Sequence, residues 1–283
     1  MNQRHEMIDS APAEAKVLAQ QDPFARDPLT CIRVRVQQEA LERMKWVIEQ
    51  GMFGIFTGEV GSGKTTLIRT ILQELDPLRY EPVYLSISEM KPAEFYGEML
   101  RRFGEPTPFG LTRAKRAWED WLKRREIQEQ RKLVVVIDEG QEMTAAMLLE
   151  LRFVMAQQMD SQSAFPLLLI GQPELRHLMR LNKFEAIAQR AAIQYHLGAM
   201  SQEDTAHYIR TQMNPANRPA DWPRFAEGAI QLIHSASKGI PRMINKFGMI
   251  ALKEAQSKQT DVIDEILMTR VIKDLEKQRG AAG

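Results

Sequence analysis

The sequence predicts a parallel αβα domain followed by an all-helical lid. Two unbroken apolar runs, residues 133–137 and 166–170, have the length and composition of strands that are buried on both faces of a parallel sheet. Helical patterns separate these runs from the other expected strands, as the crossover connections of a parallel sheet require. After Met200 the apolar residues recur only at helical spacing.

The expected elements alternate along the first two thirds of the chain. Apolar residues at helical spacing predict a first helix over residues 36–50, which Gly51 ends. The expected strands cover residues 53–57, 82–87, 133–137, 166–170 and 193–197, and further helices cover residues 64–75, 92–103 and 184–190.

Two turn signals mark the helical region. Ser201 followed by Asp204 is a capping-box pattern and predicts a helix start. Gly239 suits the left-handed residue that closes one helix, and Pro241 suits the first turn of the next. Arg242 then lies at a helix N-terminus, where the helix dipole does not stabilise a cation. We therefore expect Arg242 to face an anion, although an arginine exposed on the lid surface is a simpler interpretation.

Composition and charge limit the class of protein. The chain has 283 residues, of which 44% are apolar and 27% charged, and this is enough for a sizeable core. The single cysteine, Cys31, cannot form an internal disulfide. A net charge of +1 means that any polyanion would meet a local patch. No apolar run approaches the roughly 20 residues that span a bilayer, and no signal-peptide pattern occurs, so we expect a cytoplasmic protein without a membrane span.

Residues 58–65 read G-E-V-G-S-G-K-T and fit the phosphate-binding pattern G-x-x-x-x-G-K-[ST] between an expected strand and an expected helix. Glycines let the backbone curl, so that its N–H groups point at phosphate oxygens. Lys64 should reach the β and γ phosphates of ATP, and the Thr65 hydroxyl should bind Mg²⁺. A glycine-rich turn before an exposed lysine is the alternative, which the strand and helix on either side disfavour. The residues expected to bind nucleotide are Gly58, Glu59, Val60, Gly61, Ser62, Gly63, Lys64, Thr65, Thr66 and Asp138.

Polar side chains follow two of the apolar strands. Asp138 and Glu139 end the first run, where ligands bind in open α/β sheets. Asp138 would hold Mg²⁺ with Thr65, and Glu139 would orient and deprotonate the attacking water. This pair of carboxylates favours a nucleotide hydrolase over a small-molecule kinase. Gln172 follows the second run and could bond the water or the γ phosphate, or it could simply bond local backbone.

With these motifs in view, the chain resembles the AAA+ ATPases, and among them the ExeA/GspA-like group. The matching residues are 58–66, 137–141, 148–152, 171–176, 189–190 and 239–245. The resemblance implies that Gln172 is the sensor I residue, Arg190 an arginine finger that reaches a neighbouring subunit, and Arg242 the sensor II residue that meets the γ phosphate. Gly140 departs from the group, which usually has alanine there, and we expect it to add flexibility beside Glu139.

This resemblance also implies a domain division, an oligomer and a role. We expect a mobile N-terminal arm at residues 1–30, an AAA+ nucleotide-binding domain at 31–200, a helical lid at 201–279 and a disordered tail at 280–283. Secretion-type members carry a membrane span and a peptidoglycan-binding region after the ATPase, which this sequence does not contain. We therefore expect a stand-alone form similar to the transposition regulators TnsC, MuB and IstB. Such proteins form rings or helical filaments on double-stranded DNA, mostly without sequence preference, and control a DDE transposase or target-selection protein.

Two other roles remain open from the sequence. One is a cytoplasmic ExeA/MshM-like ATPase for secretion or pilus assembly, and the other is a nucleotide-controlled binding switch with negligible turnover. A basic stretch at residues 113–132 supplies a possible DNA surface, with Trp118, Trp121 and Leu122 expected on its buried face. Simple solvation of these charges is the alternative. The candidate DNA contacts are Arg113, Lys115, Arg116, Lys123, Arg124 and Arg125.

Overall fold

The described chain forms two compact units. The structure is a computed structural model, and it describes residues 23–24, 32–86, 89–128, 131–157, 162–214 and 222–280. The α/β unit contains Gln37–Val60 and Lys64–Gly198. The helical unit contains Gly61–Gly63 and the described parts of Met1–Val36 and Ala199–Gly283.

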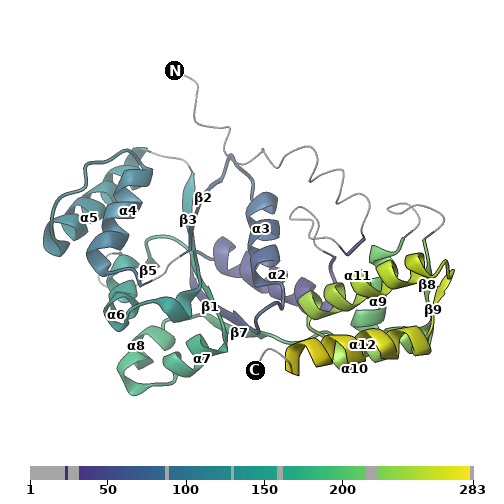
Figure 1. Cartoon of the computed structure of the whole chain (residues 1–283). Coiled ribbons are helices and arrows are strands. Elements are labelled where there is room, and N and C mark those ends of the chain that lie inside the picture. Colours follow the sequence, from purple (N-terminus) through teal and green to yellow (C-terminus); the bar gives the residue numbers. More distant parts are fainter. Residues whose placement is uncertain are drawn as a thin grey trace. The chain divides into compact units, whose positions relative to one another are not determined.

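Five parallel strands form the centre of the α/β unit (Figure 1). They are β1 (Phe53–Gly58), β2 (Tyr80–Ser86), β3 (Lys132–Asp138), β6 (Leu167–Gly171) and β7 (Ile193–Leu197), in the order β2-β3-β6-β1-β7. Every residue of β1 and β6 is buried, because central strands are covered on both faces, whereas burial alternates along much of the edge strand β2. The five predicted strands and their parallel arrangement are confirmed, with ends that shift by one or two residues; residue 87 lies outside the described range.

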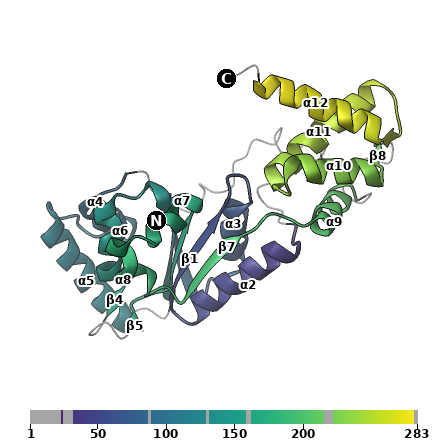
Figure 2. The same ribbon diagram turned by 90° about the horizontal axis from the view of Figure 1, so that it is seen from below.

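Helices cover both faces of this sheet (Figure 2). One face carries α2 (Arg35–Glu49) and α3 (Lys64–Glu74). The other carries α4 (Pro92–Arg102), α5 (Leu111–Gln128), α6 (Ala145–Val154), α7 (Pro173–Met179) and α8 (Glu185–Ala188), with the short elements η1 (Gly140–Glu142), β4 (Ala156–Gln157), β5 (Gln162–Ser163) and η2 (Asn182–Phe184). The predicted helices over residues 36–50, 64–75 and 92–103 are confirmed. The predicted helix over 184–190 is instead the end of η2, the single turn α8 and a bend that contains Arg190.

Aromatic packing fixes the orientation of α5. The Trp118 and Trp121 rings stack with centroids 4.8 Å apart, and Phe103 stacks on Trp121 at 4.1 Å. Trp118 and Trp121 are buried, and Leu122 packs against the same core. The predicted buried face of this helix is therefore confirmed.

The helical unit consists of four helices and a small strand pair within its described residues. The helices are α9 (Gln202–Gln212), α10 (Glu227–Ser237), α11 (Pro241–Ser257) and α12 (Glu265–Gly280). The predicted capping box is confirmed, since the Asp204 N–H donates to Ser201 Oγ at 3.0 Å and the Ser201 N–H donates to Asp204 Oδ2 at 3.4 Å. The prediction of an all-helical lid missed β8 (Arg224–Phe225) and β9 (Val262–Ile263), which pair in parallel. Two-residue strands are too short to leave an alternating pattern in the sequence.

The turn between α10 and α11 has the predicted glycine and proline. Lys238 and Gly239 both adopt left-handed backbone angles, with φ of 52° and 70°, and Pro241 is the first residue of α11. A Cβ at Gly239 would lie 2.2 Å from the Met200 carbonyl oxygen, while the Met200 N–H donates to the Gly239 carbonyl oxygen at 3.0 Å. The turn thus requires glycine for close backbone contact as well as for φ.

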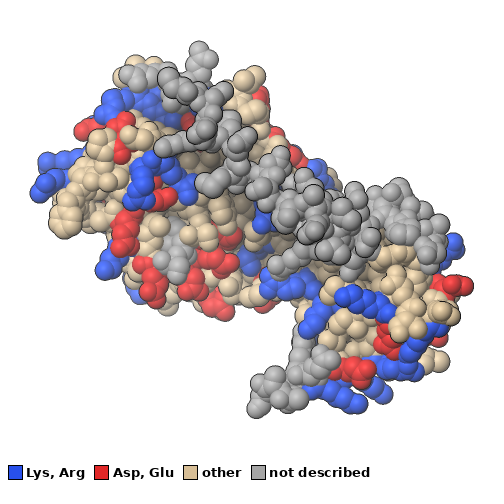
Figure 3. All heavy atoms as spheres, turned by 45° about the horizontal axis from the view of Figure 1, so that its top comes forward, with Lys and Arg blue, Asp and Glu red and all other residues tan. Residues whose placement is uncertain are grey.

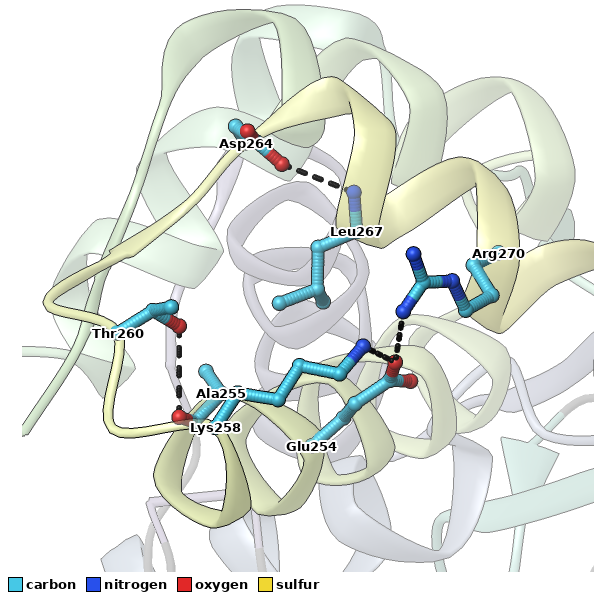
Figure 4. Close-up of polar contacts among 7 residues, drawn as sticks. All are labelled: Glu254, Ala255, Lys258, Thr260, Asp264, Leu267 and Arg270. Carbon is cyan, nitrogen blue, oxygen red and sulfur yellow. Dashed lines mark hydrogen bonds and ion pairs between the residues drawn. The ribbon is translucent and has the colours of Figure 1, made fainter.

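Polar contacts join the end of α11 to the start of α12 (Figure 4). Asp264 Oδ1 accepts the Leu267 N–H at 2.8 Å and so caps α12, while Leu267 is buried. Glu254 of α11 pairs with Lys258 and accepts from Arg270 of α12 at 3.3 Å. One carboxylate therefore links the two helices.

Phe24 departs from the prediction of a mobile arm over residues 1–30. Its side chain is 3% exposed, and its ring lies edge-to-face with Phe225 at a centroid distance of 5.8 Å. A Cβ at Gly248 of α11 would lie 2.7 Å from the Phe24 ring, so glycine gives the ring its place on that helix. The rest of the predicted arm, apart from Pro23, lies outside the described residues. The predicted tail begins at Gly280, which is the last residue of α12, and residues 281–283 lie outside the described range.

We expect Phe24→Ala to destabilise the helical unit by about 3–5 kcal/mol, because it removes a buried aromatic ring and leaves a cavity against α11. Urea unfolding followed by circular dichroism measures this change. Phe109→Ala is the matched control, since Phe109 is 92% exposed. If Phe24→Ala lowers the free energy of unfolding no more than Phe109→Ala does, Phe24 does not anchor the N-terminal segment to the helical unit.

Candidate nucleotide site

The loop at residues 58–65 joins β1 to α3 with the conformation that its glycines permit. Gly61 and Gly63 have φ of 84° and 101°, which side chains with a Cβ rarely adopt. Lys64 Nζ donates to the carbonyl oxygens of Gly58 at 2.7 Å and Glu59 at 3.0 Å. The loop therefore holds its own lysine next to the backbone that precedes it.

The residues of this loop fit a polyphosphate. The Ser62 side chain is 2% exposed, and its Oγ has no hydrogen-bond partner among the described residues. A Cβ at Gly63 would meet nothing within 4 Å, so the backbone there is open to a ligand. Thr65, at the start of α3, is exposed. Together with the helix N-terminus, these groups provide donors for phosphate oxygens and a hydroxyl for a divalent cation.

Asp138 is a buried carboxylate at the end of β3. It is 3% exposed, Oδ1 accepts the Glu139 N–H at 2.8 Å, and Oδ2 accepts the Tyr84 hydroxyl at 3.1 Å. Burial raises the pKa of Asp138, while these two hydrogen bonds and the charge of Lys64 act in the opposite direction. Burial, followed by the charge of Asp138, raises the pKa of Tyr84 to about 12, so the phenol keeps its proton.

Glu139 lies beside Gln172, as the positions of both at strand ends suggest. Glu139 has a left-handed backbone with φ of 55°. Its Oε2 accepts from Gln141 Nε2 at 2.6 Å and from Gln172 Nε2 at 3.3 Å. Gln172 follows β6 and precedes α7, so contacts between the ends of two neighbouring strands form this cluster.

Sequence reasoning assigned no role to Tyr84 or Gln141. Tyr84 lies on β2, which pairs in register with β3, and Ser86 stands opposite Asp138. Gln141 lies in η1, and its Oε1 accepts the Gln172 backbone N–H at 2.9 Å. Tyr84 could have been identified from its position, because it is a polar residue two positions before the end of β2, the strand beside β3. The Gln172 backbone N–H that Gln141 accepts is 31 residues away along the chain, so no local pattern reveals that contact.

Gly140 is buried between η1 and β6. A Cβ there would lie 2.7 Å from Leu169 Cδ1 and 3.2 Å from the Ile170 carbonyl oxygen. The glycine therefore allows the turn after β3 to pack closely against β6. Close packing therefore explains glycine at position 140, whereas the sequence had suggested flexibility beside Glu139.

His196 is a further polar residue at the sheet edge. Its Nδ1 lies 3.0 Å from Thr57 Oγ1, which is on the neighbouring strand β1. Burial, together with the charges of Arg176 and Lys64, lowers the pKa of His196, so its ring is neutral at neutral pH. The pair ties the edge strand β7 to the strand that precedes the phosphate-binding loop.

The two predicted arginines belong to different units. Arg190 lies in the α/β unit and is half-buried, and its Nη1 donates to the Arg152 carbonyl oxygen at 3.3 Å. Arg242 is the second residue of α11 and is exposed. Within the helical unit, the Arg242 backbone N–H donates to the Gly61 carbonyl oxygen at 3.2 Å.

The basic residues of α5 divide into paired and exposed sets. Arg125 is 7% exposed, pairs with Glu81 at 2.6 Å and lies over the rings of Phe103 and Trp121. We therefore remove Arg125 from the candidate DNA contacts, because its guanidinium is inside the fold. Lys115 pairs with Glu150 and Arg124 with Glu105, each at 2.9 Å.

Exposed positive charge on α5 thus comes from a smaller set than the sequence suggested. Arg113, Arg116 and Lys123 are exposed and, among the described residues, lie within ion-pair distance of no carboxylate. On the face of the molecule in Figure 3, Lys and Arg side chains are interspersed with Asp and Glu side chains.

Comparison with known proteins identifies the domain. Residues 47–179 match the model of an AAA domain. The General secretion pathway protein A of Aeromonas hydrophila is 32% identical over 210 residues, which are 73% of this chain and 38% of that protein. The chain therefore spans less than half the length of this relative.

Solved structures share the fold at low sequence identity. The ORC2 protein of Aeropyrum pernix, in ADPNP-ADP complexes, superposes with a TM-score of 0.63 and 16% identity, covering 89% of this chain and 71% of that one. Cdc6p of Pyrobaculum aerophilum superposes with a TM-score of 0.62 and 14% identity, and the match covers 85% of this chain and 67% of that one. The RuvB Holliday junction branch migration motor of Thermotoga maritima superposes with a TM-score of 0.51 and 16% identity, and the match covers 84% of this chain and 69% of that one. With its parallel sheet and phosphate-binding loop, the chain has the AAA+ P-loop NTPase fold.

Proposed function

We propose that the chain hydrolyses ATP to ADP and phosphate at the site described above. The observation that carries this proposal is the meeting of Asp138, Glu139 and Gln172 at the carboxyl edge of the sheet. Lys64 would leave its carbonyl partners for the β and γ phosphates, while Thr65 and Asp138 would hold Mg²⁺. When bound, Mg²⁺ would neutralise negative charge on the phosphates.

Glu139 is the group proposed to act on the attacking water. Its carboxylate would orient the water and accept a proton as the water oxygen attacks the γ phosphorus and the bond to the ADP oxygen breaks. Gln172 would bond the water or the γ phosphate. Support for these roles comes from the shared contact of Gln172 and Gln141 with Glu139 Oε2.

Two arginines would complete the site in an oligomer, which would be a ring or a helical filament. Arg242 would meet the γ phosphate within its own chain, and its backbone contact with Gly61 supports this role. Arg190 would reach the phosphate bound by a neighbouring subunit. An arginine at a subunit interface can stabilise charge in this way because it reaches the phosphate only when subunits assemble.

For the biological role, we infer a cytoplasmic ATPase for secretion or pilus assembly. The 32% identity to General secretion pathway protein A over 73% of this chain supports this role. It favours secretion over the transposition role that the sequence alone suggested. Among the described helices, none has the length and apolar composition to cross a membrane.

A second candidate is a DNA-assembled regulator of a DDE transposase. The exposed Arg113, Arg116 and Lys123 of α5 favour it, because repeated subunits would present these charges as an array to DNA phosphates. Solved neighbours include ORC1 of Aeropyrum pernix in complex with DNA, although 14% identity supports only the shared fold.

We expect Lys64→Ala to lose ATP binding, because the substitution removes the ammonium group that would contact the phosphates. Glu139→Gln should bind ATP normally and lose turnover by about 10²-fold or more, because the amide cannot accept the water proton. Fluorescent-nucleotide titration and steady-state phosphate release measure the two effects, and Glu174→Gln is a control with an exposed carboxylate on α7. Normal turnover by Glu139→Gln would remove this residue from catalysis, and negligible turnover by the unmodified chain would favour a binding switch.

A mixture of Arg190→Ala and Lys64→Ala subunits should recover part of the turnover that each variant lacks alone. In mixed assemblies, Arg190 of the Lys64→Ala subunit can complete the intact site of its neighbour. Phosphate release over a range of mixing ratios tests this expectation. Arg180→Ala, which changes an exposed arginine just after α7, should keep its own turnover. If the mixture shows no recovery although the subunits co-assemble, Arg190 does not act across an interface.

Duplex DNA should leave phosphate release unchanged at physiological salt if secretion or pilus assembly is the role. Filter binding to unrelated duplexes with ATP and with ADP is the companion measurement. ATP-dependent binding would instead favour the transposition role, particularly if Arg113→Ala, Arg116→Ala and Lys123→Ala together abolish it. The logarithm of the affinity would then fall with the logarithm of salt concentration by about 0.9 for each phosphate neutralised.

A further inference from the structure

The Gln141 side chain joins the turn after β3 to the end of β6. Its Nε2 donates to Glu139 Oε2 at 2.6 Å, and its Oε1 accepts the Gln172 backbone N–H at 2.9 Å. The Gln172 side chain reaches the same Glu139 oxygen at 3.3 Å. The shorter of the two amide contacts to Glu139 is therefore the one from Gln141.

Two glycines give Gln141 the space to make these bonds. A Cβ at Gly171 would lie 2.8 Å from Gln141 Oε1, and a Cβ at Gly140 would lie 2.7 Å from Leu169 Cδ1 on β6.

Leu169 and Leu175 side chains also border these two positions, so the strand exits are close-packed around the amide. Glu139 itself has the left-handed φ of 55°, which aims its side chain from a backbone that few residues adopt. The polypeptide around Glu139 is thus built to bring its carboxylate to the Gln141 amide.

We propose that Gln141 is a positioning residue that fixes the Glu139 carboxylate and holds it in register with Gln172. This inference rests on the proposed hydrolysis at Glu139. One amide contacts the residues that follow two neighbouring strands, so it ties the Glu139 carboxylate after β3 to the Gln172 backbone after β6. Gln141 acts through Glu139 and does not itself touch the reacting atoms.

Loss of the Gln141 side-chain amide should lower the rate of ATP hydrolysis more than it lowers the affinity for ATP. Without Gln141, the Glu139 carboxylate keeps only the 3.3 Å contact from Gln172, and its side chain gains rotational freedom. Misplacement of a catalytic group by about 1 Å can cost about 10²-fold in rate. ATP affinity depends on the loop at residues 58–65, which does not include this amide.

Two substitutions separate the two bonds of Gln141. Gln141→Met keeps the side-chain length and removes both bonds. Gln141→Glu keeps an acceptor for the Gln172 N–H, removes the donor to Glu139 and places two carboxylates together. Gln189→Met is the matched control, because Gln189 also donates to a glutamate, Glu185 at 2.9 Å, on the exposed side of α8.

The first measurement is steady-state turnover with a separate ATP titration. We expect kcat to fall by about 10- to 100-fold in Gln141→Met and Gln141→Glu, with ATP affinity within about twofold of the unmodified chain. Adding Gln141→Met to Glu139→Gln should cause no further loss, because Gln141 acts only through Glu139. Gln189→Met should leave both quantities unchanged.

The second measurement does not depend on turnover. Amide hydrogen exchange of Gln172 in the nucleotide-free protein should become faster in Gln141→Met, which lacks the acceptor, and stay protected in Gln141→Glu. Thermal melting of each variant verifies that it is folded. If Gln141→Met is unfolded, Gln141→Glu alone still tests the effect on kcat.

Separate outcomes overturn separate claims. Turnover of Gln141→Met and Gln141→Glu within about threefold of the unmodified chain, while Glu139→Gln is inactive, would overturn the positioning role alone. A further loss in the double variant would also overturn it, since Gln141 would then act independently of Glu139. Normal turnover by Glu139→Gln would instead overturn the proposed function and this inference with it.

Discussion

The parallel pairing of β3 with β6 is the constraint on which the candidate site depends. Residues 135–137 stand opposite residues 167–169, so the two strands leave the sheet at the same edge. Asp138 and Glu139 follow one strand and Gln172 follows the other, and the hydrogen bonds among Glu139, Gln141 and Gln172 close the gap between them. Side chains at positions 140 and 171 would force the two turns apart, which explains glycine at both positions.

Burial gives Asp138 a chemistry that an exposed aspartate lacks. Desolvation raises its pKa, and the Glu139 N–H, the Tyr84 hydroxyl and the charge of Lys64 only partly offset this effect. A cation beside a buried carboxylate is screened less than one in bulk water, so it stabilises the ionised form more strongly. A cation bound beside Asp138 would therefore favour the ionised form of this carboxylate.

The sequence predicted what depends on local pattern and missed what depends on pairing across the fold. Continuous apolar runs predicted the central strands, and residue spacing predicted the loop at 58–65. The contacts of Tyr84 with Asp138 and of Gln141 with Gln172 were missed because they join residues that are distant along the chain, and β8 and β9 were missed because two residues leave no period. Arg125 is a different case: it follows Trp118, Trp121 and Leu122 at positions i+7, i+4 and i+3, so helical phase alone places it on their buried face. Counting charge without phase caused that error.

The position of Arg125 bears directly on the choice of partner. Of the six basic residues considered for DNA contact, one is buried and two are held by Glu150 and Glu105, which leaves Arg113, Arg116 and Lys123. Binding to duplex DNA depends mainly on the number of phosphates that a protein neutralises, so each subunit loses half of the expected contribution. The charge available for DNA on α5 is therefore smaller than the sequence suggested.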